Sequence, residues 1–376
     1  MPAVKPYPTL SLWGEPPWTI DFKPAARTLP EQVDFAVVGG GFTGLAAAVA
    51  LRRLAPEKTV AVLEASSIGG GASGRTGGIA LAGTAAGEMP ELGDALAGFA
   101  DFLREVGVDA GLQARGVWEI GRSRGRRDSP IEWRDSGTLR VVNEVPGGTI
   151  DPGRLLSGLG RAAERLGALV FEHAPVLAAR FQNPLVLLLP PGELRAHRVL
   201  FATNAFALDL LDLVGRAQPK FTLAVATAPL GREALEALGL TERKPFYTLD
   251  LPYLWGRVLS SGGIVFGAGL VHVRDGGELN SIDVDSGEAR ELLDGLMERV
   301  RGLHPVLASV EFTHRWGGPI LFTPDWNPIF CPHPASNRAL ILAGYCGHGV
   351  ALSVHLGRWA AEVLAGRRND LPEFET

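Results

Sequence analysis

Short apolar runs flank an alanine-rich segment near the start of the chain. Residues 35–38 read FAVV, residues 60–63 read VAVL, and residues 45–51 between them read LAAAVAL. Short apolar runs bounded by polar residues or glycine are typical of buried strands, and a longer apolar segment is typical of a buried helix. The pattern predicts a strand, a helix and a second strand, which is the repeating unit of an α/β layer structure.

A glycine-rich turn joins the first of these strands to the helix. Its three spaced glycines would allow a sharp turn, a close backbone approach to a pyrophosphate, and close packing of the helix on the sheet. The first amides of the helix would point at the phosphates. The pattern indicates a dinucleotide-binding unit; the alternative is an ordinary glycine turn. The predicted contacts are Gly39, Gly41, Phe42, Thr43 and Gly44.

An acidic residue and a long loop of small residues follow the second strand. Glu64 can accept hydrogen bonds from the ribose hydroxyls of an adenosine. Residues 65–78 read ASSIGGGASGRTGG, a loop able to wrap an extended cofactor, which favours FAD over NAD(P). The alternatives are a flexible linker and an NAD(P) dehydrogenase in which this loop is incidental. The predicted contacts are Glu64, Ala65, Ser73, Gly74, Arg75, Thr76 and Gly77.

Four ordered segments, residues 71–78, 151–176, 199–205 and 343–350, together resemble the FAD-dependent oxidoreductases of the D-amino-acid-oxidase superfamily. Its glycine oxidase, sarcosine oxidase and γ-glutamylputrescine oxidoreductase branches are the relevant ones for this resemblance. The positions at which relatives attach the flavin through Cys or His hold neither residue, so the resemblance implies non-covalent FAD. It also implies further cofactor contacts at Val176, Ala202, Thr203, Gly344, Gly347, His348, Gly349 and Val350.

The implied fold is α/β, with a doubly wound, Rossmann-like FAD-binding domain and an inserted α+β substrate domain built on an antiparallel sheet. With 376 residues, the chain exceeds the size at which single cores stop growing. We expect an N-terminal arm at 1–30, packed on the surface by its tryptophans. The FAD-binding domain would comprise 31–85, 141–215 and 316–376, and the substrate domain 86–140 and 216–315.

Within these domains the pattern predicts several individual elements. Helical periodicity begins near residue 92, and further helices are expected at 152–166, at about 286–302 and at the C-terminus. Residues 185–189 and 340–343 read as strands of the cofactor domain. The expected strands of the substrate domain are residues 221–227, 247–253, 264–270 and 310–314.

Composition narrows the possible partners. The net charge of -5 argues against a nucleic-acid binder, and no apolar run approaches a membrane-spanning length. Two cysteines and no visible secretory segment favour a cytoplasmic location. A basic cluster, interpreted as a solvated loop with an anionic partner as the alternative, comprises Arg122, Arg124, Arg126, Arg127 and Arg134. We predict no metal ligands and leave the oligomeric state open.

The expected reaction is oxidation of an amine C–N bond by hydride transfer to flavin N5, with oxygen or another acceptor reoxidising the flavin. The candidate catalytic residues are His348, Trp316 and Arg315. His348 would lie near the flavin or the substrate amine, or else be structural. The loop 344–349 would aim a helix N-terminus at the charge of the reduced flavin.

The sequence also bears on the class of amine. A lysine expected in relatives that bind a carboxylate is replaced by Ala351, which favours an amine without a neighbouring carboxylate. Arg257 and Arg315 remain possible carboxylate partners. The alternatives are therefore an amino-acid oxidase or dehydrogenase of the glycine, sarcosine or D-amino-acid type, and a non-catalytic flavoprotein subunit. An aromatic substrate wall is expected from Tyr247, Tyr253, Trp255, Phe266 and Trp316.

Overall fold

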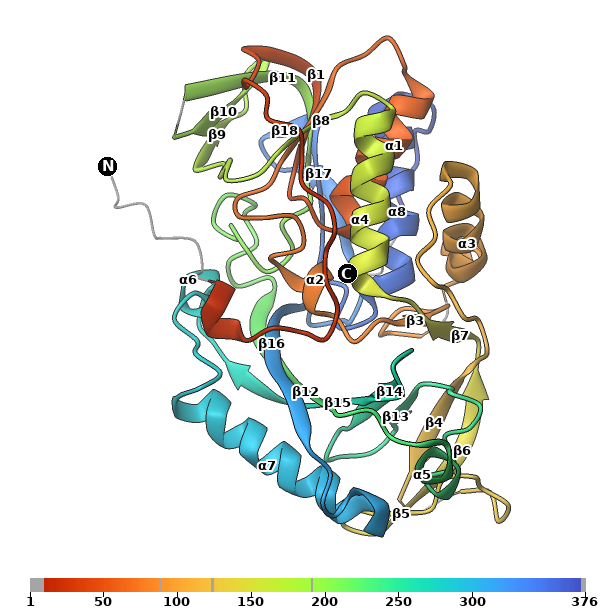
Figure 1. The fold of residues 1–376 in the computed structure, drawn as a ribbon. Helices are drawn as coiled ribbons and strands as arrows, with labels where there is room; N and C mark the ends of the chain where they lie inside the picture. Colours follow the sequence, from red (N-terminus) through yellow and green to blue (C-terminus); the bar gives the residue numbers. More distant parts are fainter. Residues whose placement is uncertain (1–9, 88, 123–124, 191, 373–376) are drawn as a thin grey trace.

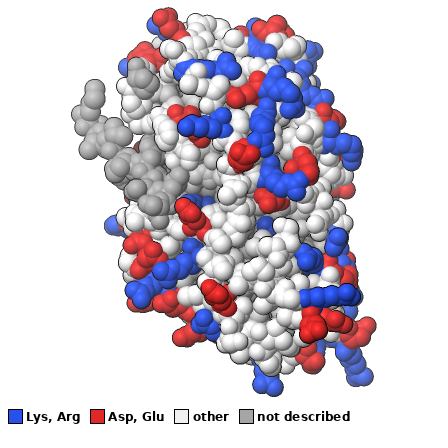
Figure 2. Space-filling view, viewed as in Figure 1, with Lys and Arg blue, Asp and Glu red and all other residues white. Residues whose placement is uncertain are grey.

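The computed structural model describes residues 10–87, 89–122, 125–190 and 192–372. Two large sheets lie one above the other in Figure 1, and the chain passes between them several times. No helix among the described residues is long and apolar enough to cross a bilayer. On the face drawn in Figure 2, acidic and basic side chains are interspersed.

The first sheet has the strand order β17-β18-β11-β1-β2-β8, and β9 and β10 extend it beside β11. The central five strands run parallel, as the alternation of apolar runs and helices predicts. Its strands are β1 (Gln32–Val38), β2 (Val60–Leu63), β8 (Leu169–Phe171), β9 (Ala178–Arg180), β10 (Leu185–Leu189), β11 (Gly192–Phe201), β17 (Ile329–His333) and β18 (Ser336–Ala343).

Helices cover one face of this sheet, on the right in Figure 1. Helix α1 packs against α4 and α8, and α3 packs against α8. Alanine and glycine on α1 and α8 allow this close approach, because Gly357 of α8 lies directly on the backbone of Thr43 in α1. The helices are α1 (Phe42–Leu54), α3 (Ala95–Val106), α4 (Pro152–Arg165) and α8 (Gly349–Leu364).

The second sheet has the order β16-β12-β15-β14-β13-β4-β6-β5. All neighbours are antiparallel except β13 and β4. Its strands are β4 (Val117–Gly121), β5 (Trp133–Arg134), β6 (Thr138–Val145), β12 (Gln218–Thr227), β13 (Phe246–Thr248), β14 (Trp255–Val258), β15 (Ile264–His272) and β16 (Phe312–Phe322).

Helix α7 (Gly287–Leu303) packs on β12 and β15, on the side of this sheet that faces away from the first. The remaining elements are short and join the two layers or edge them. They are η1 (Leu10–Trp13), α2 (Ala72–Arg75), β3 (Ile79–Leu81), η2 (Pro90–Leu92), β7 (Gly147–Thr149), α5 (Arg232–Ala237), α6 (Gly276–Leu279) and η3 (Pro305–Leu307).

The architecture confirms the expected α/β fold with a large, mostly antiparallel second sheet, and it corrects some elements. The strand expected at 247–253 ends at Thr248, because residues 249–253 form a loop that contains Pro252. The strand expected at 310–314 begins at Phe312 and continues to Phe322. Within 86–140, helix α3 packs with α8 beside the first sheet, whereas β4 to β6 join the second. The domain boundaries stay a prediction.

Many residues of the N-terminal arm between 15 and 28 are exposed, but Trp13 is buried more deeply than the expected surface packing. The Trp13 side chain is 0% exposed, and its Nε1 donates to the carbonyl of Leu279 at 3.1 Å. Its ring meets Phe221 of β12 at a centroid distance of 5.3 Å. Trp18 donates to the carbonyl of Gly74 at 2.7 Å. The arm therefore fills the junction between the layers; residues 1–9 lie outside the described residues.

The basic cluster is also not a uniformly solvated loop. The side chain of Arg122 is 9% exposed and forms an ion pair with Asp135 at 2.6 Å. Asp135 pairs in turn with Arg299 of α7 at 2.7 Å. A guanidinium with so little exposure needs such partners to offset its lost hydration. Because Asp135 pairs with both arginines, Arg122 is linked through it to α7. Arg124 lies outside the described residues.

Candidate active site

One cavity of about 1530 Å³ opens between the carboxyl ends of the first sheet and the facing side of the second. This is larger than a site for a small ligand alone, which is usually about 300–1,000 Å³. Seventeen of the twenty predicted cofactor contacts line the cavity. These seventeen residues lie at the carboxyl ends of parallel strands or in the loops beside those ends. The three that do not line it are Gly44, Gly74 and Gly344.

The glycine turn after β1 has the geometry that the sequence predicts. Gly39 has φ of +108°, a conformation that other residues rarely adopt. A side chain on Gly44 would overlap the carbonyl of Gly39, so this glycine acts by packing and not by lining the cavity. A Cβ on Gly41 would come within 2.8 Å of the Ser73 hydroxyl. The backbone at Gly41 is therefore open to a ligand only because this residue has no side chain.

Glu64 lies at the end of β2 and lines the cavity. Its Oε2 accepts from the amide of Gly40 at 2.8 Å, and its Oε1 accepts from the amide of Ser66 at 2.9 Å. Burial raises the pKa of this carboxyl, and the two backbone hydrogen bonds oppose that effect. A carboxylate has about four acceptor positions, so Glu64 retains capacity for two hydroxyl donors.

The 71–78 loop folds back onto the start of α1. The Ser73 hydroxyl accepts from the amide of Phe42 at 3.0 Å, which fixes the loop beside the glycine turn. A Cβ on Gly74 would overlap the carbonyl of Gly69, so Gly74 closes the loop and does not line the cavity. Sequence spacing therefore located this loop correctly.

Arg75 contacts more than the cavity. Its guanidinium donates to the carbonyls of Trp13 at 3.1 Å, Gly14 at 2.8 Å and Gly317 at 3.2 Å, and it lies 5.2 Å from the Trp13 ring. Burial lowers its pKa to about 10. We expected Arg75 to serve the flavin or its phosphates, but these contacts show that it joins the arm to the second sheet.

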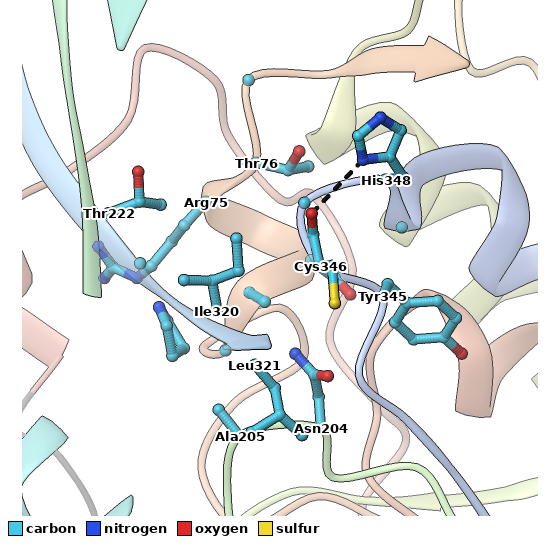
Figure 3. A pocket seen from close by; sticks show the side chains of 18 of the residues that line it. Arg75, Thr76, Asn204, Ala205, Thr222, Ile320, Leu321, Tyr345, Cys346 and His348 are labelled. Carbon is cyan, nitrogen blue, oxygen red and sulfur yellow. Dashed lines mark hydrogen bonds between the residues drawn. The ribbon is translucent and has the colours of Figure 1, made fainter. Parts of the chain in front are cut away.

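The loop after β18 forms another part of the cavity wall. Gly344 and Gly347 have φ of +73° and +88°, which allows the tight loop before α8. The Gly344 amide donates to the side chain of Asn204 at 3.0 Å, a residue that sequence reasoning missed. Figure 3 shows Cys346 and His348 of this loop around the same pocket as Arg75 and Thr76.

His348 is the residue immediately before α8. Its Nδ1 lies 3.4 Å from the carbonyl of Cys346, the contact dashed in Figure 3. Burial lowers the pKa of the imidazole, so the neutral form is favoured near neutral pH. A cation here would also oppose the positive end of the α8 dipole. His348 therefore leaves the helix N-terminus as the positive group on this side of the cavity.

The opposite wall is formed by side chains of the second sheet. Three register neighbours on β4, β13 and β14 stand side by side on its inner face: Glu119, Tyr247 and Trp255. The Tyr247 hydroxyl donates to Glu119 Oε1 at 2.6 Å, and Asn143 Nδ2 donates to Glu119 Oε2 at 3.1 Å. Burial, and then the bond to Glu119, raise the pKa of Tyr247. Glu119 was missed because only strand pairing brings it into the site.

Trp255 connects the two walls. Its ring lies over Gly77 of the 71–78 loop and over Gly267 of β15, where a side chain on either glycine would overlap it. Tyr253 also lines the cavity and is 44% exposed. Phe266, by contrast, does not line the cavity. It packs within the core against Phe246, with the two ring centroids 6.0 Å apart. Three of the expected aromatics thus face the site, together with Trp316.

The other candidate catalytic residues differ in position. Trp316 lines the cavity, but it is 1% exposed and its Nε1 donates to the carbonyl of Arg75 at 3.0 Å. Arg315 does not line the cavity and pairs with Asp285 at 2.6 Å. Successive side chains of a strand point to opposite faces, so β16 cannot direct both residues inward. The site role of Arg315 stays a prediction, which its position outside the cavity does not support.

Arg257 is also held elsewhere. Its side chain is buried, its Nε donates to the carbonyl of Gly77, and it lies 5.7 Å from the ring of Trp18. Burial lowers its pKa to about 10. It does not line the cavity. The structure thus uses Arg257 to hold the 71–78 loop, not to face a substrate.

Comparison with known proteins agrees with this geometry. Residues 34–363 match the family described as FAD dependent oxidoreductase (DAO). The chain belongs to this family. Gamma-glutamylputrescine oxidoreductase of Escherichia coli (strain K12) is 27% identical over 385 residues, covering 90% of this chain and 85% of that protein. Glycine oxidase of Geobacillus kaustophilus (strain HTA426) is 24% identical over 390 residues, covering 92% of this chain and 97% of that protein.

Solved structures show the same fold. L-proline dehydrogenase from P. horikoshii superposes with a TM-score of 0.70 at 20% identity, covering 92% of this chain and 96% of that one. The glycine oxidase structure from Geobacillus kaustophilus superposes with a TM-score of 0.67 at 21% identity, covering 90% of this chain and 96% of that one. This FAD-dependent oxidoreductase therefore shares both the sequence pattern and the architecture of its family.

The residues present fit FAD. The glycine turn, the spare acceptor positions of Glu64 and the N-terminus of α8 line one continuous cavity. Ser353 of α8 also lines this cavity. Within the described part of the chain, no cluster of three or more His, Cys, Asp and Glu could hold a metal ion.

Proposed function

We propose that this FAD-dependent oxidoreductase oxidises the C–N bond of an amine that has no carboxylate on the reacting carbon. The observation that carries the proposal is the pairing of walls across one cavity. The FAD-binding loops face Glu119, Tyr247 and Trp255, an acidic and aromatic surface suited to an amine.

The charges that line the cavity support this substrate class. Its cationic lining residues are Arg75, Arg299 and His348. Arg75 donates to backbone carbonyls and Arg299 pairs with Asp135 at 2.7 Å, while burial lowers the pKa of His348. A carboxylate taken from water without a cationic partner loses several kcal/mol, about the size of the penalty for an unpaired buried ion. An α-amino acid would meet that penalty here, and a simple amine would not.

The protein's own groups would act as follows. FAD, when bound, would supply the acceptor for the hydride that leaves the carbon bearing the nitrogen, so that the C–N bond becomes C=N. The amides at the start of α8, before Val350, would stabilise negative charge on the cofactor side. The uncharged His348 adds no competing proton there. Trp255 and Tyr253 would hold the apolar body of the amine and keep water away.

We also propose that FAD is held without a covalent bond. Cys346 lines the cavity, but its Sγ is 3.3 Å from the Thr323 amide and 3.2 Å from the Thr323 hydroxyl. Burial raises the pKa of this thiol, which disfavours the reactive thiolate. Acid precipitation should release all flavin to the supernatant, and flavin that stays with the pellet would contradict the proposal.

Anaerobic mixing tests the reaction. A panel of primary and secondary amines, polyamines, sarcosine, glycine, proline and D-amino acids should bleach the flavin fastest with amines that lack an α-carboxylate. Arg315→Ala should not alter these rates, since Arg315 is outside the cavity. Bleaching by none of these compounds would favour a non-catalytic flavoprotein subunit. Admission of air afterwards shows whether oxygen or another acceptor reoxidises the flavin.

The cellular setting is a further proposal. Cys331 and Cys346 are both free thiols in the structure. Free cysteines are usual in reducing compartments. They support a cytoplasmic location, which fractionation of cells that produce the tagged protein would test.

A further inference from the structure

We infer that Glu119 and Tyr247 form a subsite for a second cationic group of the substrate, so that the preferred amines are diamines or longer polyamines. The inference rests on the proposed amine oxidation and names the substrate class of that same site. It begins from a carboxylate that lines the cavity and accepts hydrogen bonds from the side chains of Tyr247 and Asn143, both of them neutral.

Within the described part of the chain, the charge of Glu119 has no partner ion. Among the described residues no Lys, Arg or His side chain forms an ion pair with it. The neighbouring acid Glu144 shows the contrast, because it pairs with Lys244 at 2.9 Å. Arg299, which also lines the cavity, pairs with Asp135 at 2.7 Å. Glu119 is half-buried, and a half-buried carboxylate without a counter-ion favours the binding of a cation.

The geometry around Glu119 is fixed before a ligand arrives. Tyr247 and Asn143 are its register neighbours on β13 and β6, so the carboxylate is held from both sides by neighbouring strands. Each carboxylate oxygen accepts one hydrogen bond and keeps about one further acceptor position. An ammonium group has three donors and can use both.

The aromatic surface next to Glu119 gives the subsite its direction. Tyr247 stands between Glu119 and Trp255 in the register, and Trp255 lies over Gly77 of the cofactor loop. The row therefore runs from the cofactor loop toward the acid. An alkyl chain lying along Trp255 and Tyr247 would place one nitrogen near the cofactor and a second nitrogen at Glu119. A monoamine would leave Glu119 without its cation.

The test compares cadaverine with pentylamine, which differ only in the second amino group, and repeats the comparison with putrescine and butylamine. Anaerobic flavin reduction in the wild-type holoprotein should favour each diamine by tenfold or more in kcat/KM, as expected for a charge-assisted hydrogen bond. Glu119→Gln should remove most of that preference, mainly through a higher KM for the diamine, so that each diamine and its monoamine react with similar kcat/KM. Glu291→Gln removes the same charge from an exposed position on α7 at the cavity and should leave the preference in place.

A binding measurement keeps the inference separate from catalysis. Photochemically reduced holoprotein cannot oxidise an amine, so calorimetry with cadaverine and pentylamine reports affinity alone. Tighter binding of cadaverine that Glu119→Gln abolishes would support the subsite even if no amine were oxidised. Equal affinity for the two amines, or an unchanged preference in Glu119→Gln with flavin retained, would overturn it. Amine oxidation without a diamine preference would leave the proposed function standing and remove this inference alone.

Discussion

The two walls of the cavity are built by different means. The cofactor wall consists of loops at the ends of parallel strands, where glycines at 39, 41 and 347 expose backbone amides. The proposed substrate wall consists of side chains on a sheet face, from Glu119, Tyr247 and Trp255, and Glu119 is far from the other two in the chain. A backbone site tolerates little change in shape, whereas a side-chain site can change its ligand by single substitutions.

The largest effect is expected where backbone packing shapes the cofactor wall. In Gly44→Ala the new methyl group would overlap the Gly39 carbonyl, so the turn must distort and the protein should lose FAD or fail to fold. Gly302→Ala is the matched control, since Gly302 also lies in a helix and has no atom near its Cβ position. That variant should retain FAD and gain up to about 1 kcal/mol of stability. Full flavin content in purified Gly44→Ala would show that the packing argument is wrong.

The next effect concerns the arm, which belongs to neither wall. Trp13→Ala should reduce the free energy of unfolding by about 3–5 kcal/mol, because a fully buried aromatic ring leaves a cavity between the layers. Trp326→Ala is the control, since this tryptophan is 51% exposed and should change stability by less than about 1 kcal/mol. Urea unfolding of the holoproteins checks both. Equal losses would mean that the arm does not join the layers.

Glu64→Ala tests a side chain within the cofactor wall. The loss of two hydrogen bonds from a charged acceptor to the ribose should weaken FAD binding by on the order of 3 kcal/mol, or about a hundredfold. The fold should persist, and Glu64→Gln, which keeps one acceptor oxygen, should lose less. Equilibrium dialysis of FAD against the refolded apoproteins measures the change. Copurification of Glu64→Ala with full flavin at high dilution would exclude Glu64 as the ribose ligand.

The smallest effect is a pH dependence at the start of α8. Burial holds the pKa of His348 below its usual value of 6.5. As the pH falls below 6.5, His348 takes up a proton in the unfolded chain but stays neutral in the folded chain. The free energy of unfolding therefore falls as the pH drops from 6.5 through the folded pKa. In His348→Gln, unfolding free energies measured between neutral and mildly acidic pH should fall less steeply. Parallel curves for the two proteins would show that His348 is not buried as a neutral group.

The same contrast explains what the sequence could predict. The glycine turn, Glu64 and the 344–350 loop act through local backbone geometry, which leaves a pattern in neighbouring residues. Glu119 and Asn204 left no such pattern, because strand pairing and a contact across 140 positions bring them to the site. The direction of the Arg315 side chain could not be predicted for a related reason: it depends on the register of β16, which an isolated sequence does not specify. Trp13 looked like a surface residue until its partner Phe221 was known.

The most direct test of the two-wall account is anaerobic flavin reduction by pentylamine and by both enantiomers of norleucine, which add only an α-carboxylate to the same amine. The account predicts that pentylamine reduces the flavin at least roughly tenfold faster than either enantiomer, since an uncompensated carboxylate is penalised by several kcal/mol. Faster reduction by D- or L-norleucine would contradict it, and would show that the cavity offers a carboxylate a partner that the two walls do not provide.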